Sequence, residues 1–269
     1  MLFDDRYIYI LCKAITKNKN FVIPSLRWDF SGRASDKINL AFETFSDQSK
    51  NYKIDISLYG MGSNFGDFDN YGWLDFYIGT GSPEFTSVIP NRMFRNLDGK
   101  SFEEVTSAGG FGHIQKGHGV GFADLDNDGD QDIYTVLGGA YEGDNYPNIC
   151  FENPISNNNW IILKLEGVES NRSAIGTQLK LDLENGRSIY YSINTGGSFG
   201  ANSLQAEIGL GSIKLIDTLT IMWPNSKAQI FKRIEGNKKY KLVEGGNKLI
   251  EDPYHKIQLT GGEIMHHQN

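Results

Sequence analysis

Five aspartates within nine residues are the strongest chemical signal of this chain. The segment DLDNDGDQD places a carboxylate at every second position and a glycine, Gly129, at its sixth place. Carboxylates held this close repel one another unless a cation lies among them. Oxygen ligands at alternate positions, with a glycine for the sharp turn, suit a hard cation of the calcium type. The segment therefore predicts bound Ca²⁺ rather than a reaction, and its aspartates are Asp124, Asp126, Asp128, Asp130 and Asp132.

The five positions have different expected roles in such a loop. We expect the first three carboxylates to point inward, Asp130 to offer its main-chain carbonyl, and Asp132 to close the shell. An EF-hand does not fit, because its twelfth position would be Thr135 and the sequence IYTVLGG that follows favours a strand. The remaining alternative is an acidic surface turn without a metal.

The acidic loop occurs twice. A second copy, DFDNYGWLD, begins at Asp67, which lies 57 residues before Asp124, and the same offset aligns PNRMFRN with PNICFEN. Internal repeats of this length with several short strands are typical of propeller blades or stacked β-units. The first loop has Tyr71 where the second has a carboxylate, so we expect weaker binding there, or a water in the missing place. Its candidate metal-site positions are Asp67, Asp69, Tyr71, Trp73 and Asp75.

These loops and the sequence after them resemble known families. The D-x-D-x-[DN]-G-x-x-D loops, followed by aromatic strand residues, resemble FG-GAP/VCBS repeats, the blades of integrin-α-type propellers. The sequence after Asn153 resembles an ASPIC/UnbV domain, the C-terminal module of cartilage-acidic-protein-like (CRTAC-like) proteins. Three stretches carry this second resemblance: NNNWIILKLEGVESNRSAIGTQL, TGGSFGANSLQAEIGLG and LTIMWPNSKAQIFKRIEGNKKYKLVEG. The resemblance implies a secreted or cell-surface calcium-binding repeat protein, and no established reaction for the C-terminal module.

The sequence predicts an all-β chain in three parts. Residues 1–153 form FG-GAP/VCBS β-propeller blades, as an arc truncated at its N-terminal side. Residues 154–246 form the ASPIC/UnbV module, a small antiparallel β-sandwich with alternating apolar residues and an Asn-Gly hairpin turn at Asn185–Gly186. Residues 247–269 form a polar, poorly ordered tail. Two and a half blades cannot close a ring, so we expect unpaired edge strands in the arc.

Composition and motifs limit the classes of function. A formal net charge of −7 argues against nucleic-acid binding, and no apolar run is long enough for a membrane span. The common hydrolase, metalloprotease and nucleotide-binding motifs are absent from the sequence. We therefore expect a non-enzymatic recognition, adhesion or scaffold protein with an unknown protein or glycan partner, for which Trp73 and Phe199 are candidate exposed aromatics. The alternative is a polysaccharide lyase or hydrolase framed by the propeller.

The cysteines and the N-terminus bear on localisation. Cys12 and Cys150 both lie in apolar surroundings, which favours buried free thiols over a disulfide. The first residues lack a signal-peptide pattern, because Asp4, Asp5 and Arg6 precede only a short apolar run. Together with the extracellular or cell-surface location that the resemblance implies, this predicts that the chain is a fragment of a longer protein.

Overall fold

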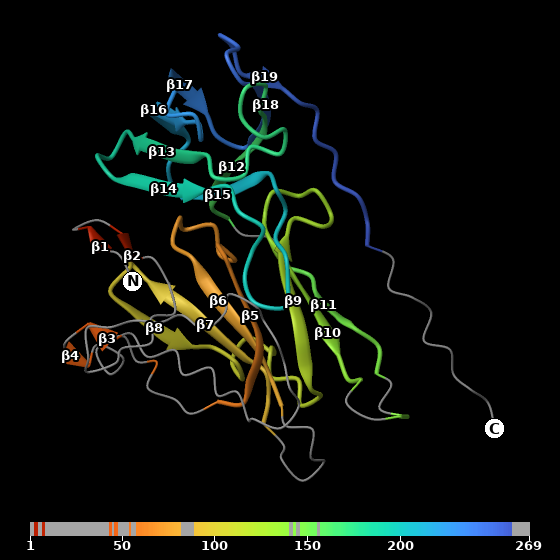
Figure 1. Cartoon of the computed structure of the whole chain (residues 1–269). Coiled ribbons are helices and arrows are strands. Elements are labelled where there is room, and N and C mark those ends of the chain that lie inside the picture. The colour runs from red at the N-terminus through yellow and green to blue at the C-terminus, as the bar shows by residue number, and fades with distance from the viewer. Residues whose placement is uncertain are drawn as a thin grey trace, which may run out of the picture.

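A computed structural model gives the structure of the chain (Figure 1). It describes residues 54, 58–81, 89–139, 142–143, 146–154 and 157–259. It also describes the backbone of four short strands nearer the N-terminus: β1 (Phe3–Asp4), β2 (Tyr7–Ile8), β3 (Glu43–Thr44) and β4 (Ser46–Asp47). None of the described residues lies in a helix, so the all-β prediction is confirmed for this part of the chain. Nor does the described part hold a helix long and apolar enough to cross a membrane.

The first described blade is a four-stranded antiparallel sheet with the order β5-β6-β7-β8. Its strands are β5 (Gly60–Gly66), β6 (Asp75–Thr80), β7 (Arg92–Leu97) and β8 (Ser101–Glu104). Every residue of β6 is buried, because both faces of this central strand are covered. Its Phe76 stacks on Phe94 at a centroid distance of 4.6 Å and meets Phe102 edge-on. This aromatic cluster forms the core of the blade.

The second described blade repeats the first two strands of the first blade but differs from it in its later strands. Its strands are β9 (Gly117–Ala123), β10 (Asp132–Leu137) and β11 (Ile149–Phe151), in the order β11-β10-β9. β9 and β10 begin and end 57 residues after β5 and β6, so the sequence repeat is one hairpin built twice. The same offset places residues 158–161 where β8 would recur, but most of these residues belong to the next sheet. Among the described residues, no fourth strand joins β11.

The C-terminal module is a sandwich of two four-stranded sheets, ordered β15-β12-β18-β19 and β14-β13-β16-β17. Its strands are β12 (Asn159–Glu166), β13 (Gln178–Leu183), β14 (Ser188–Ser192), β15 (Ala206–Gly211), β16 (Leu215–Met222), β17 (Ala228–Glu235), β18 (Lys238–Val243) and β19 (Ile250–Glu251). Alternate apolar residues of both sheets meet in one core cluster, as the sequence pattern predicts. The largest side chain buried there is Trp223. In Figure 1 the sandwich lies above the ends of both blades.

One strand pair in the module differs from the antiparallel prediction. β12 and β18 run parallel, with Ile161 opposite Lys238 and Glu166 opposite Val243. Alternation of apolar residues fixes which face of a strand is buried, but it carries no information on strand direction. The chain leaves β12, builds the whole opposite sheet and β15, and returns in the same direction as β18.

The loop 194–203 of the module enters the space between the two blades. Ser198 and Ser63 exchange two backbone hydrogen bonds, of 2.8 and 3.1 Å. The Asn202 amide accepts N–H groups from Asn64 (2.5 Å) and Phe122 (3.1 Å), which belong to different blades. Module and arc are therefore joined by hydrogen bonds as well as by chain connectivity.

Two expectations, about the C-terminal segment and about Cys150, are corrected. The polar segment after residue 246 is not a loose tail over its described part, because β19 pairs with β18 and the Ile257 N–H donates to the Asp126 carbonyl at 2.6 Å. Residues 260–269 lie outside the described residues. Cys150 is exposed rather than buried, because β11 turns its neighbours Ile149 and Phe151 inward. Its relation to Cys12 also lies outside the described residues.

Candidate metal centres

Both acidic loops join antiparallel strands, and their backbones take positive φ angles at the same two places. The first connects β5 to β6 and the second connects β9 to β10. Asn70 and Asn127, at the fourth place of each loop, have positive φ angles of 55° and 60°. The glycines at the sixth place, Gly72 and Gly129, have φ angles of 81° and 100°. Asparagine and glycine tolerate this left-handed conformation better than other residues, so the sequence NxG specifies the loop shape.

The first aspartate of each loop closes that loop in the same way. Asp67 Oδ2 accepts the Gly72 N–H at 2.8 Å, and Asp124 Oδ2 accepts the Gly129 N–H at 2.8 Å. In the first loop, Asp67 Oδ2 also accepts the N–H of Gly209 in β15 at 2.8 Å. The module therefore contributes a hydrogen-bond donor to the first loop.

The ninth-place aspartates, Asp75 and Asp132, fasten each loop to the next strand. Each accepts two backbone N–H groups, one from the second place of its own loop and one from an asparagine 21 residues later. The donors to Asp75 are Phe68 (3.0 Å) and Asn96 (2.7 Å), and those to Asp132 are Leu125 (2.9 Å) and Asn153 (2.9 Å). The two asparagines end the aligned segments PNRMFRN and PNICFEN, so this part of the repeat has a structural role.

The structure brings two groups of three carboxylates together. In each group every residue offers an oxygen within 4.8 Å of the others; the groups are Asp67, Asp69 and Asp75, and Asp124, Asp126 and Asp128. Two candidate ligands of the second loop, Asp130 and Asp132, are not in the second group. The Asp130 N–H donates to Asp128 Oδ1 at 3.1 Å.

The two aromatic positions of the first loop lie beside arginines. The Tyr71 ring is exposed and lies 5.5 Å from the guanidinium of Arg95, and the Tyr71 carbonyl accepts a hydrogen bond from Arg187 at 2.7 Å. The Trp73 ring lies 5.6 Å from the Arg187 guanidinium. It is partly buried, so Trp73 is not the exposed aromatic that we expected, whereas Phe199 is 47% exposed.

The first group contains a buried carboxylate oxygen without a partner. Asp67 is 3% exposed, and its Oδ1 has no hydrogen-bond donor among the described residues. Burial, reinforced by the charge of Asp69, raises the pKa of Asp67 to about 7. Asp69 itself is bound by Arg95 Nε, which lies 2.7 Å from its Oδ2. An ionised Asp67 is costly here unless a further cation is present, and the donor set fits a hard metal ion.

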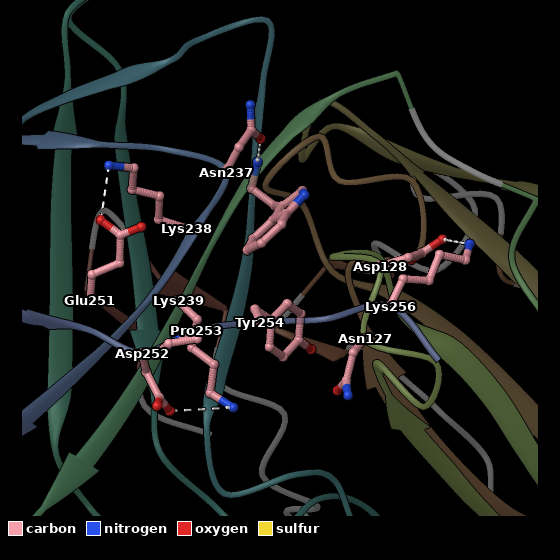
Figure 2. Close-up of a pocket in the computed structure, with 11 residues that line it drawn as sticks. Asn127, Asp128, Asn237, Lys238, Lys239, Glu251, Asp252, Pro253, Tyr254 and Lys256 are labelled. Carbon is pink, nitrogen blue, oxygen red and sulfur yellow. Dashed lines mark hydrogen bonds and ion pairs between the residues drawn. The ribbon is translucent and has the colours of Figure 1, made fainter. Parts of the chain in front are cut away.

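The second group is filled by the chain itself. Lys256 Nζ lies 3.1 Å from Asp126 Oδ2 and 2.7 Å from Asp128 Oδ2, and the Tyr254 hydroxyl donates to Asp124 Oδ2 at 2.6 Å. Figure 2 shows Lys256 reaching Asp128 beside Tyr254. The other oxygens of these three aspartates accept backbone N–H groups of the same loop. Burial raises the pKa of Asp128, but the hydrogen bonds from Lys256 and Asp130 and the charge of Lys256 together outweigh it, and the pKa is lowered.

A buried polar chain connects the two loops with the module. Gln131 accepts the Asp67 N–H at 2.7 Å and donates to Glu207 Oε2 at 2.8 Å. Glu207, in β15, also accepts the Asp124 N–H at 3.2 Å, and burial raises its pKa. Asn70 donates to the Gly129 carbonyl at 3.1 Å. The two candidate centres therefore lie side by side, and the module fixes their relative positions.

Sequence reasoning missed the basic residues at both centres. Lys256 lies more than 120 residues after the loop that it enters, and no local pattern indicates that contact. One signal was available within the repeat, because the 57-residue offset aligns Arg95 with Glu152. The second repeat thus has an acid where the first has the arginine that binds Asp69.

Two protein-family models match this chain. The model of the FG-GAP-like repeat matches residues 67–135, which span both acidic loops. The model named ASPIC and UnbV matches residues 167–249, which lie within the sandwich. No curated protein matches the chain. The predicted architecture of FG-GAP repeats followed by an ASPIC/UnbV module is confirmed, while the predicted domain limits at 153 and 246 stay predictions.

Proposed function

We propose, from an architecture that joins FG-GAP-like repeats to an ASPIC/UnbV module, that this chain is a calcium-binding recognition or scaffold protein without enzymatic activity. FG-GAP repeats typically occur in extracellular proteins, and neither family is known as an enzyme family. We place the protein outside the cell or at the cell surface, with a protein or glycan partner. Calcium, when bound, stabilises the loops between the strands.

The observation that carries this proposal is the buried Asp67 Oδ1, which has no donor in the part of the chain that the structure describes. A buried carboxylate oxygen without a donor costs free energy that a metal ion would offset. The neighbouring Asp69 and Asp75 supply the further oxygens that Ca²⁺ prefers. At the second loop, Asp124, Asp126 and Asp128 would hold the ion, with the Asp130 carbonyl and Asp132 as the expected further ligands.

Calcium should raise the melting temperature of metal-free protein. A metal that binds only the folded state stabilises it by mass action, by about 2.7 kcal/mol at a concentration 100 times the Kd. For a chain of this size, that corresponds to a rise of several degrees. Thermal unfolding followed by circular dichroism would measure it, over calcium concentrations bracketing about 10⁻⁴ to 10⁻³ M.

Three single substitutions and one double variant make this test specific. Asp67→Asn should remove the contribution of the first loop and Asp126→Asn that of the second, so the double variant should show no calcium response. Asp217→Asn, on the exposed side of β16, removes the same charge away from both loops and should respond like the parent protein. An unchanged melting temperature of the parent protein across the titration would rule out the calcium proposal.

Calcium binding at the first loop should weaken as the pH falls below about 7. The pKa of Asp67 in the metal-free folded state is about 7, above the ordinary value of 3.8. Between these values the folded state holds a proton that the unfolded state has released, so metal-free stability decreases as the pH rises. Calcium binds the ionised form and must expel this proton, so its stabilising effect should grow from pH 5.5 to pH 8.

Urea unfolding at several pH values, with and without calcium, would measure this dependence. Asp67→Asn, which cannot ionise, should remove the part of the decrease in metal-free stability that Asp67 contributes. The buried Asp75 and Asp132, whose pKa values are also raised, keep the remainder. A calcium effect of equal size at pH 5.5 and pH 8 would contradict the assignment of Asp67 as a ligand.

A further inference from the structure

The second acidic loop differs from the first in that every carboxylate oxygen of its three grouped aspartates has a donor. Each of the six oxygens of Asp124, Asp126 and Asp128 accepts a backbone N–H, the Tyr254 hydroxyl or the Lys256 ammonium. The Lys256 ammonium stands where a cation would bind, in contact with two side chains of the group. In the first loop, by contrast, Asp67 Oδ1 is buried without a donor in the described structure.

The segment that carries Lys256 is held in place by several contacts. We call residues 252–257 the strap. It begins where β19 ends, and the Tyr254 ring packs near Trp160 (5.8 Å between centroids) and under Lys239, whose Nζ lies 4.8 Å from the ring centroid. The Ile257 N–H donates to the Asp126 carbonyl at 2.6 Å. A cavity of about 310 Å³ lies beside the strap, between the second loop and the module (Figure 2).

The repeat explains why the second loop takes its cation from the strap. In the first repeat, Arg95 on β7 binds Asp69 and supplies a positive charge from within the blade. The equivalent position in the second repeat is Glu152, which is negative. Without a local arginine, the three grouped aspartates would repel one another, and Lys256 offsets that repulsion from outside the repeat.

We propose that Lys256 is the resident cation of the second loop, and that calcium enters this loop only by displacing Lys256 and the strap. This inference rests on the proposed function. The second loop therefore binds calcium less tightly than its carboxylates alone would allow, because only the fraction of molecules with the strap released is competent. Calcium binding also frees the strap from the loop, which makes the position of residues 252–257 depend on calcium.

Calorimetry of calcium binding in an Asp67→Asn background would report on the second loop alone. In this background Lys256→Met, which keeps an apolar stem but removes the charge, should tighten binding about three- to tenfold, as expected if the strap is closed in about 70 to 90% of molecules. Lys256→Arg keeps a cation and should stay close to the parent affinity. The matched control Lys248→Met removes an exposed lysine just before β19 and should leave the affinity unchanged.

Melting temperatures give a second readout that a merely structural lysine would not produce. Lys256→Met should lower the melting temperature of the metal-free protein and leave that of the calcium-saturated protein unchanged. Equal losses in both states, or calcium binding by Lys256→Met with the parent affinity, would overturn the inference while leaving the calcium proposal intact. If no variant binds calcium at either loop, the proposed function itself fails, and the proposed displacement of Lys256 by calcium fails with it.

Discussion

Replacing Gly129 with alanine should lower the free energy of unfolding by about 2 to 6 kcal/mol. Gly129 has a φ of +100°, which an L-residue adopts only with strain, at a cost of about 1 to 3 kcal/mol. A Cβ at this position would also lie 1.9 Å from Cε2 of Trp160, so the indole would have to move. Such overpacking adds about 1 to 3 kcal/mol. Trp160 is part of β12, so the change disturbs the contact between the second acidic loop and the module.

The control for this prediction is Gly186→Ala. Gly186 also has a positive φ, of 82°, but an added Cβ would meet no atom within 4 Å. Its substitution therefore reports backbone strain alone, and the difference between the two variants reports the contact with Trp160. Chemical denaturation of the metal-free proteins would measure both. Equal losses for the two variants would show that Gly129 does not support the indole.

Trp223→Ala should destabilise the chain by about 3 to 5 kcal/mol, the usual cost of removing a large buried aromatic side chain. Trp223 is 1% exposed, belongs to the core between the two sheets of the module, and donates its indole N–H to Gln229 at 2.5 Å. Ile230→Ala, on β17 nearby, is the matched control, because Ile230 is 61% exposed and its truncation should cost little.

This variant also tests whether module and arc unfold together. The loop 194–203 and the Gly209 N–H both contact the arc, so loss of the module core should reduce the stability of the blades as well. We expect near-ultraviolet circular dichroism and calcium release to follow one transition in urea. A destabilised module that unfolds while the blades keep their calcium would contradict this coupling.

Sequence reasoning predicted the parts of the structure that local patterns determine. The 57-residue offset predicted two equivalent loops, and in the structure their flanking strands keep this offset and their ninth-place aspartates accept equivalent backbone N–H groups. Alternating leucines predicted the buried face of β13, and Asn185–Gly186 predicted the hairpin that follows it. Each of these features depends on residues close together in the chain, where spacing and turn chemistry are directly readable.

The features that sequence reasoning missed depend on contacts between distant residues. Lys256 and Tyr254 look like ordinary residues of a polar tail, and only the path of the chain after β19 brings them to the second loop. The loop 194–203 carries Phe199, a candidate aromatic for a partner, yet its Ser198 and Asn202 form hydrogen bonds with the two blades. The parallel direction of β18 was missed because alternation does not encode direction.

The parallel pairing of β12 with β18 imposes an order on folding during synthesis. Ile161 and its partner Lys238 are 77 residues apart. This edge of β12 therefore cannot pair with β18 until nearly the whole module has been synthesised. At about 5 to 20 residues per second, the wait is about 4 to 15 seconds. Closing so long a loop also slows the pairing of β12 with β18 once both strands have been synthesised. The hairpins of both blades need only local pairing, so they should form first. The last strands of the module should then pair and fix the positions of the blades.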